Sequence, residues 1–275
     1  MNKLTHSLCL LTSVVALAAG ACSSSGMPAT TGNGGGSGAN NFPLTPTATG
    51  YVDDRANTGV VGAWYAYADS IGSAAQGSAD GDIANSDCIK KGGFTAAQCS
   101  VVNSPKAGAE FPPDPSKGMC TNGTAALVLP GSNGMADYSD MWGAGIGLDF
   151  KNPGGDAGVK TDWDGSPYGG VEFDIVGDNV PAKAMRVNFP FTGEHGTDSP
   201  YYQGKTQAFS AMASGDHVVV HWSDVAGPKY LIDQNMTPPA FDVTHIQSIQ
   251  FQVFTNATTA TPYSFCINNL AVLKK

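Results

Sequence analysis

The stretch Gly169–Gly177, GGVEFDIVG, alternates apolar and polar side chains with a period of two. In an extended chain Val171, Phe173 and Ile175 share one side, and two acidic residues share the other. A period of two bounded by glycines is typical of a β-strand. One face of this strand can therefore lie in an apolar core while the other meets solvent or a ligand.

The same pattern recurs along the chain after Gly50, in segments bounded by Gly, Pro, Asn or Asp. We expect strands over 59–69, 124–130, 145–150, 169–177, 184–191, 206–212, 216–222, 246–254 and 263–273. No segment has a convincing amphipathic helical pattern, and 35 glycines and 17 prolines with only 13% charged residues also argue against helices. The sequence predicts an all-β fold, a two-sheet antiparallel β-sandwich.

The polar sides of four of these segments carry side chains that form directed hydrogen bonds. They are Glu172, Asp174, Arg186, Asn188, His221, Gln250 and Gln252. Such residues are unusual in the middle of a bare strand. If the strands adjoin, these side chains line one polar surface that can bind a ligand. The alternative is an ordinary solvated face of an antiparallel sheet.

Charge and motifs narrow the classes of function. A formal net charge of −9 argues against nucleic acid or anionic lipid as a partner, because both need clustered Lys and Arg. His217 and His221 lie about 13 Å apart on a strand, too far to share one metal ion. The sequence has no G-x-S-x-G elbow, no H-E-x-x-H motif and no phosphate-binding loop. We therefore expect no catalytic residues.

The N-terminus has the layout of a bacterial lipoprotein. Residues 1–21 combine a positive Lys3, a short apolar core and small residues before Cys22, which we expect to be lipidated. Ordinary signal cleavage nearby, with Cys22 as a spare thiol, is the alternative. Residues 22–50 are rich in Gly, Ser and Pro and predict a flexible tether of about 30 Å. The sandwich domain is expected over 51–275, with a loop insertion around 70–118.

Four cysteines, Cys88, Cys99, Cys120 and Cys266, remain after the signal and the lipidated residue. An even number in an exported domain indicates disulfides, and four cysteines allow three pairings. We favour Cys88 with Cys99 as a local clip, and Cys120 with Cys266 as a bridge to the last strand. A zinc site is the rival, but no C-x-x-C spacing is present.

The stretches GAWYAYAD (62–69), WGAGIGLDF (142–150), YGGVEFDIVG (168–177), FDVTHIQSIQFQVF (241–254) and YSFCINNLAVL (263–273) carry a resemblance. Together they resemble the galactose-binding-like jelly roll of carbohydrate-binding modules, nearest to family 11 and the related families 4 and 22. The similarity covers roughly 50–275 without 70–118. A lipoprotein tether before such a body is also similar to surface lipoproteins of myxobacteria.

This resemblance implies that glycans bind the concave face of one sheet, through aromatic rings and polar side chains. Tyr201 and Tyr202 are the ring candidates beside the polar set. It also implies a structural calcium ion, with Asp69 and Asn268 at the positions that match the family's ligands. Among the tryptophans we expect Trp64, Trp142 and Trp222 in the core and Trp163 in an exposed loop.

These observations predict a surface lipoprotein of the bacterial outer membrane that binds carbohydrate without catalysis. Its partners would be a glycan and, through the lipid anchor only, the membrane. One alternative is an adhesive or protein-binding lipoprotein. The other is a jelly-roll polysaccharide lyase of the family 7 kind, for which Arg186, Gln250, His221 and Tyr202 have suitable chemistry. The R-x-E-L-R and Q-I-H signatures of those lyases are absent.

Overall fold

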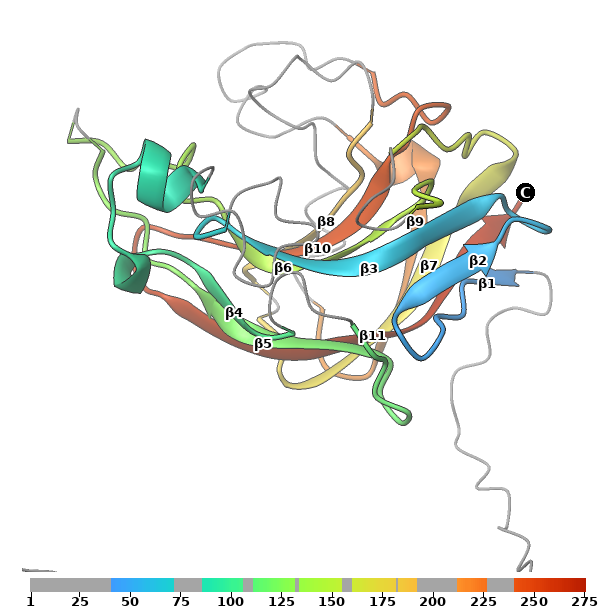
Figure 1. Ribbon diagram of the computed structural model, residues 1–275, viewed down its shortest axis with the longest axis horizontal. Helices are drawn as coiled ribbons and strands as arrows, with labels where there is room; N and C mark the ends of the chain where they lie inside the picture. The colour runs from blue at the N-terminus through green and yellow to red at the C-terminus, as the bar shows by residue number, and fades with distance from the viewer. Residues whose placement is uncertain are drawn as a thin grey trace, which may run out of the picture. The chain divides into compact units, whose positions relative to one another are not determined.

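The computed structural model describes residues 41–71, 86–105, 111–131, 134–154, 160–181, 183–191, 212–226 and 240–275. These residues form two antiparallel sheets packed face to face, with only short helical turns (Figure 1). The predicted all-β sandwich is confirmed. The signal, Cys22 and most of the predicted tether lie outside the described residues. Among the helices of the described part, none is long and apolar enough to span a bilayer.

The first sheet has the order β4-β5-β11-β7-β9, and β1 pairs with β11 on the same sheet. The bounds are β1 Phe42–Pro43, β4 Val101–Ser104, β5 Met119–Ala125, β7 Tyr168–Asn179, β9 Asp216–His221 and β11 Thr261–Lys274. The second sheet has the order β2-β3-β6-β10-β8. Its bounds are β2 Tyr51–Asp54, β3 Val60–Ala68, β6 Gly143–Asp149, β8 Met185–Asn188 and β10 Ser248–Phe254. The turns are η2 Asp87–Lys91, η3 Ala96–Gln98 and η5 Trp222–Asp224.

The apolar sides of the strands meet between the sheets, as the alternation predicts. Phe173 of β7 and Phe251 of β10 are fully buried, and their rings pack edge to face with centroids 4.9 Å apart. Full burial of one such side chain stabilises the fold by about 1.5–3 kcal/mol. Because the side-chain period on a strand is two, burying Phe173 and Phe251 turns every second neighbour outward. This parity decides which residues can form a site.

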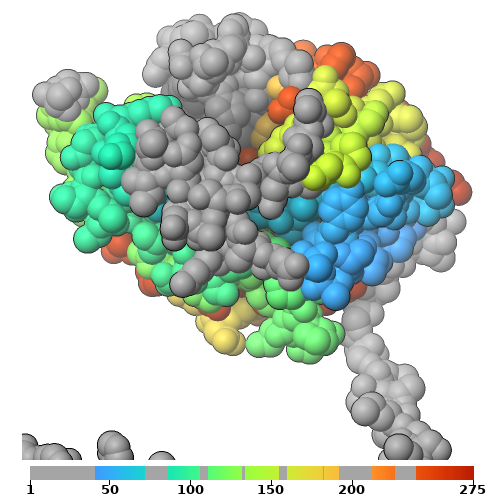
Figure 2. All heavy atoms as spheres, in the orientation of Figure 1, coloured from blue at the N-terminus to red at the C-terminus, as the bar shows by residue number. Residues whose placement is uncertain are grey.

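The domain begins earlier than the predicted boundary at residue 51. Phe42 of β1 pairs with Val272 of β11, and the backbone N–H of Leu44 donates to the carbonyl of Leu270 at 2.8 Å. Leu44 is only 3% exposed. Residues 41–71, blue in Figure 2, form part of one continuous surface with the rest of the domain. The apolar residues Phe42 and Leu44 therefore belong to the sandwich and not to the tether.

Three further strands differ from expectation. The segment expected over 124–130 ends as a strand at Ala125, because β5 begins at Met119 and pairs with β11 from there. The expected loop around 70–118 contains the edge strand β4, which pairs with β5. The short β2 was not expected. The segment expected over 206–212 lies outside the described residues except for Met212.

Both predicted disulfides are present. Cys88 is bonded to Cys99, and Cys120 to Cys266. Cys120 and Cys266 are direct partners in the register of β5 and β11, so this bridge joins neighbouring strands of the first sheet. The Cys88–Cys99 bridge joins the η2 turn to the residue that follows η3.

Candidate functional site

The predicted polar residues lie on two different surfaces. Glu172 and Asp174 are on β7 and His221 ends β9, all in the first sheet. Arg186 and Asn188 are on β8, and Gln250 and Gln252 are on β10, all in the second sheet (Figure 1). The two outer faces point away from each other because the core lies between them. The prediction of one shared polar surface is wrong, and Tyr201 and Tyr202 lie outside the described residues.

The outer face of the second sheet carries two rows of side chains that cross four strands. One row runs Tyr65, Gly147, Gln250 and Asn188, and the next runs Tyr67, Gly145, Gln252 and Arg186. We call these eight residues, together with Trp142 just before β6, the two-row face. In Figure 1, β3 curves so that the outer side of this sheet is concave.

Gly147 lets Tyr65 lie across β6. A Cβ atom at position 147 would come within 2.7 Å of the Tyr65 ring, so only glycine leaves room for the ring in this position. The Tyr65 hydroxyl reaches beyond β6, where it accepts a hydrogen bond from Gln250 Nε2 at 3.0 Å and donates to Ser248 Oγ at 3.3 Å. Burial raises the pKa of Tyr65, so the hydroxyl stays protonated at neutral pH.

Gln252 is the centre of a polar network on the second row. Its Oε1 accepts hydrogen bonds from Arg186 Nε at 2.7 Å and Asn188 Nδ2 at 2.8 Å, and its Nε2 donates to the carbonyl of Trp142 at 3.0 Å. Gln252 and Asn188 are buried, whereas Arg186 is half-buried. The two amides therefore support the guanidinium group of Arg186, which also lies over the Phe254 ring at 5.7 Å.

Three aromatic rings lie side by side on the two-row face. The rings of Tyr67 and Trp142 are stacked, with centroids 5.7 Å apart and 26° between the planes. Tyr65 and Tyr67 are 5.9 Å apart. All three residues are half-buried. Trp142 was expected in the core, but it precedes β6 on the outer side of the sheet.

A basic group closes the Tyr65 end of the face. Lys160 Nζ lies 2.9 Å from Asp149 Oδ1 and 5.0 Å from the centroid of the Tyr65 ring. Asp149 is buried, and its second oxygen accepts a hydrogen bond from Asn152 Nδ2 at 3.0 Å. The two-row face, with Lys160 beside it, thus combines aromatic rings, primary amides and two cationic side chains in a fixed arrangement.

The other three tryptophans lie elsewhere. Trp64 and Trp222 pack on the core, as expected. Trp163 was expected in an exposed loop, but it is 2% exposed. Its ring stacks on Tyr168 at 5.4 Å, and its Nε1 donates to the Thr58 carbonyl at 2.8 Å. Neighbouring aspartates in the sequence suggested exposure, but the backbone of Trp163 itself pairs with Ile246, and the ring is buried.

On the first sheet, the predicted residues Glu172 and Asp174 are in contact with other side chains of the protein. Asp174 Oδ1 lies 2.7 Å from His217 Nδ1, and Asp174 Oδ2 accepts a hydrogen bond from Asn269 Nδ2 at 2.6 Å. Glu172 is only 3% exposed, and its Oε2 lies 3.5 Å from His217 Nε2. His221 is exposed at the end of β9. The carboxylates of this face are therefore occupied or covered by the protein itself.

Asp69 and Asn268 do not form a common metal site. The buried Asp69 accepts hydrogen bonds from the backbone N–H and hydroxyl of Ser100 at 2.7 and 2.8 Å and from the Gly143 N–H at 2.9 Å. The Ser100 hydroxyl in turn accepts a hydrogen bond from the N–H of Ala126. The residue before it, Ala125, pairs with Thr261, so Asp69 lies near the start of β11. Asn268 lies seven residues further along β11, which is about 23 Å. The predicted pair of ligands is therefore wrong.

The residues suggested for a lyase do not come together either. Arg186 and Gln250 share the two-row face, but His221 lies on the opposite sheet. Tyr202 lies outside the described residues. Of the three residues that the structure describes, only two can therefore contact the same ligand.

Comparison with known proteins gives few relatives. No protein-family model matches the chain, and no curated protein is similar to it. Among solved structures, the chain is similar to the family 11 carbohydrate-binding module of the cellulosomal cellulase Lic26A-Cel5E of Clostridium thermocellum. The identity is 13%, the match covers 64% of this chain and 86% of the module, and the TM-score is 0.27.

A second match is a solution structure named CtCBM11, at 15% identity over 57% of this chain and 84% of that one, also with a TM-score of 0.27. Both matches are to the carbohydrate-binding family that the sequence resembles. At this identity and TM-score they say nothing about what this chain binds.

Several residues of the two-row face were missed by reasoning from the sequence. In the β3 sequence VVGAWYAYA, the period of two that buries Trp64 places Tyr65 and Tyr67 on the outer side. That signal was present in the sequence. Trp142 and Lys160 follow no alternating pattern, because each lies outside a strand, and the hydrogen-bonding partner of Trp142 is 55 residues away in the chain.

Proposed function

We propose that this chain binds glycans without catalysis through the two-row face. The observation that carries the proposal is the register that brings the rings of Tyr65 and Tyr67 into the same two rows as Gln250 and Arg186. We further propose that an acylated Cys22 anchors the chain in the bacterial outer membrane, as the N-terminal sequence predicts.

The chemistry of a pyranose suits this arrangement. Its CH-rich faces pack on aromatic rings, and the half-buried Tyr65, Tyr67 and Trp142 supply such rings. Its hydroxyl groups pair with a planar amide and a guanidinium, here Gln250 and Arg186. Because hydrogen bonds within the face already fix these side chains, little rotamer freedom is lost on binding.

A glycan array followed by pull-down on insoluble polysaccharides tests the glycan proposal. The protein is the full exported chain with Cys22→Ser, which removes the thiol that would be lipidated. Tyr67→Ala and Gln250→Ala should each weaken retention by about tenfold or more, a loss of about 1.4 kcal/mol. His221→Ala is the matched control, because it changes an exposed polar residue on the opposite sheet and should leave retention unchanged.

Absence of retention on every neutral and acidic glycan would reject the proposal and favour the adhesive alternative. An equal loss in His221→Ala would place the binding surface elsewhere. Release of unsaturated uronates, seen as new ultraviolet absorbance, would favour a lyase.

The anchor is tested separately by metabolic labelling with a fatty acid. The wild-type chain should incorporate label and partition with the outer membrane, and Cys22→Ala should do neither. An unlabelled wild-type chain would show ordinary signal cleavage instead of lipidation.

A further inference from the structure

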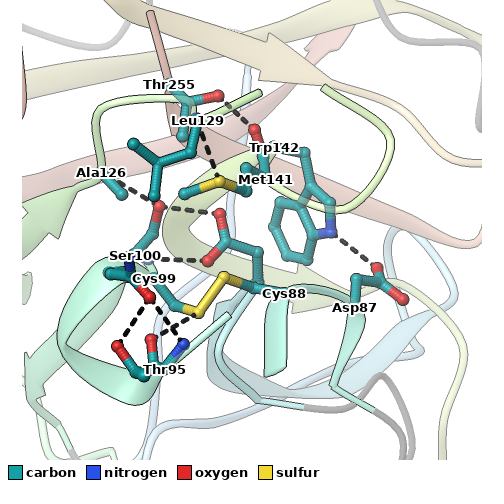
Figure 3. The surroundings of a disulfide bond; sticks show 12 residues. Asp87, Cys88, Thr95, Cys99, Ser100, Ala126, Leu129, Met141, Trp142 and Thr255 are labelled. Carbon is teal, nitrogen blue, oxygen red and sulfur yellow. Dashed lines mark hydrogen bonds between the residues drawn. A yellow bond between two sulfur atoms is a disulfide. The ribbon is translucent and has the colours of Figure 1, made fainter. Parts of the chain in front are cut away.

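Trp142 is held in the two-row face by a segment that belongs to neither sheet. Its Nε1 donates to Asp87 Oδ2 at 2.7 Å, while its ring stacks on Tyr67. Figure 3 shows the indole and the Asp87 carboxylate pointing toward one another. The direction of the indole ring is therefore set by the position of Asp87.

Asp87 is in turn fixed by the Cys88–Cys99 bridge. Asp87 opens the five-residue η2 turn directly before Cys88, and Cys88 is fully buried (Figure 3). The two sulfur atoms lie in an apolar cluster with Ala126, Val128 and Met141.

The bridge and the tryptophan also share one anchor residue. The backbone N–H of Cys88 donates to the Asp69 carbonyl at 2.9 Å. Asp69 bonds on its other side to Gly143, the residue after Trp142, through both its side chain and its backbone N–H. Cys88 and Trp142 are thus held against the same end of β3.

The bridge acts on Asp87 together with backbone hydrogen bonds, in which the Cys88 N–H donates to the Asp69 carbonyl and the Gly92 N–H donates to the Asp87 carbonyl at 2.7 Å. A single short helical turn is not stable in water without outside contacts. The Asp87 carboxylate also forms an ion pair within η2, with Asp87 Oδ1 2.6 Å from Lys91 Nζ, and Lys91 is largely exposed. The bridge closes a loop with a sequence separation of 11 residues and so removes most of the freedom of this segment.

We propose that the Cys88–Cys99 bridge, acting through Asp87, positions Trp142 and thereby sets the affinity of the two-row face for its ligand. The second half of this statement rests on the proposed glycan binding, and the first half does not. Asp87 and the bridge are positioning elements, since they would act on the ligand through Trp142.

The indole N–H resonance of Trp142 tests the positioning directly. Spectra of the ¹⁵N-labelled chain with Cys22→Ser are recorded, and Trp142→Phe assigns the cross-peak. The double variant Cys88→Ser with Cys99→Ser should shift or broaden this peak. The indole peaks of Trp163 and Trp222 should stay, because their Nε1 atoms bond to the carbonyls of Thr58 and Gly165.

The double variant Cys120→Ser with Cys266→Ser is the matched control. It removes the other bridge, which lies within the first sheet, and should leave the Trp142 peak unchanged. An unmoved peak in the Cys88 and Cys99 variant would overturn the proposal, as would an equal shift in both double variants.

A second set of variants leaves the bridge intact, so that the test does not depend on how well the cysteine variant folds. Asp87→Ala removes the acceptor for Trp142 Nε1 and should shift the indole peak. Asp87→Asn keeps a carbonyl oxygen as acceptor and should restore the wild-type position. Lys91→Ala removes the ion pair but keeps the carboxylate that accepts the hydrogen bond from Trp142. Its indole peak should therefore lie where that of Asp87→Asn lies. A wild-type spectrum for Asp87→Ala would overturn the proposal.

Binding is then measured on a glycan that the wild-type chain retains. Loss of one stacked ring from the site should weaken affinity by about five- to tenfold in Asp87→Ala and in the Cys88 and Cys99 variant, and by less than about twofold in Asp87→Asn. Unchanged affinity with a displaced Trp142 would reject the statement that Trp142 sets the affinity of the two-row face. If the wild-type chain binds no glycan, the proposed function fails, and the indole spectra still decide whether the bridge positions Trp142.

Discussion

Asp69 should make the stability of this domain depend on pH between 5 and 7. Its carboxylate is buried where β3 ends, and this desolvation raises its pKa to about 6, although Ser100 and Gly143 donate hydrogen bonds to it. In the unfolded chain the same group titrates near the ordinary value of 3.8. The folded state therefore holds the proton more tightly than the unfolded state.

The direction and size of this pH dependence follow from the difference in pKa between the folded and unfolded states. A raised pKa in the folded state means that the contribution to stability is complete below the unfolded pKa and is lost as the pH rises through about 6. With the pKa values of 3.8 and about 6, the free energy of unfolding should fall by roughly 1.3 kcal/mol between pH 5 and pH 7. Carboxyls with a lowered pKa, such as Asp53 and Asp114, act in the opposite direction and at lower pH.

Urea unfolding followed by tryptophan fluorescence measures this slope, and Asp69→Asn provides the reference. The variant cannot titrate at this position, and its amide group faces N–H donors, so it should be less stable by about 1–3 kcal/mol. Its stability should nevertheless change less over this pH range than that of the wild type, because it lacks the buried carboxyl of Asp69. Parallel curves for the two proteins between pH 5 and pH 7 would refute the assignment.

Three further changes have definite expected outcomes. Phe251→Ala should lower the free energy of unfolding in urea by about 3–5 kcal/mol, because it opens a cavity between the sheets. Gly147→Ala should displace the Tyr65 ring and weaken retention on a bound polysaccharide, since its Cβ would lie 2.7 Å from that ring. Joint replacement of Cys120 and Cys266 by serine should lower the melting temperature in calorimetry, at a cost of about 2–5 kcal/mol, because a bridge with a sequence separation of 146 residues is lost.

A different result would contradict each of these three predictions. A small effect of Phe251→Ala would mean that the sheets close over the gap. Normal retention by Gly147→Ala would separate Tyr65 from the binding site. An unchanged melting temperature in the double serine variant would mean that the pairing of β5 with β11 does not depend on the bridge.

The sequence could predict which side chains of a strand face the core, but it could not predict which strands pair with one another. Alternation correctly placed Phe173 and Phe251 inside and Glu172 and Gln250 outside, because a strand has only two sides. It contains no information on which sheet a strand joins. β7 pairs with β9 and β11, whereas β10 pairs with β6 and β8, and these contacts join residues far apart in the chain.

The same distinction explains the candidate site. Tyr65 and Tyr67 could have been assigned to the outer side, because they alternate with the buried Trp64. Trp142 could not, since its direction depends on a hydrogen bond to a residue 55 positions earlier. Asp69 and Asn268 were joined only by the family resemblance, and their local sequence does not reveal that each already has hydrogen-bonding partners within the protein.

The pairing of β1 with β11 has a practical consequence for attaching this domain to anything else. Phe42 and Val272 are neighbours, so β1, the first strand of the described residues, and the last strand β11 both belong to the sheet that does not carry the two-row face. A reporter or a biotin joined after Lys275 would therefore sit near Phe42 and leave the concave side free. Immobilising the chain through either end should present the same side to the medium, which makes the two orientations interchangeable in surface measurements.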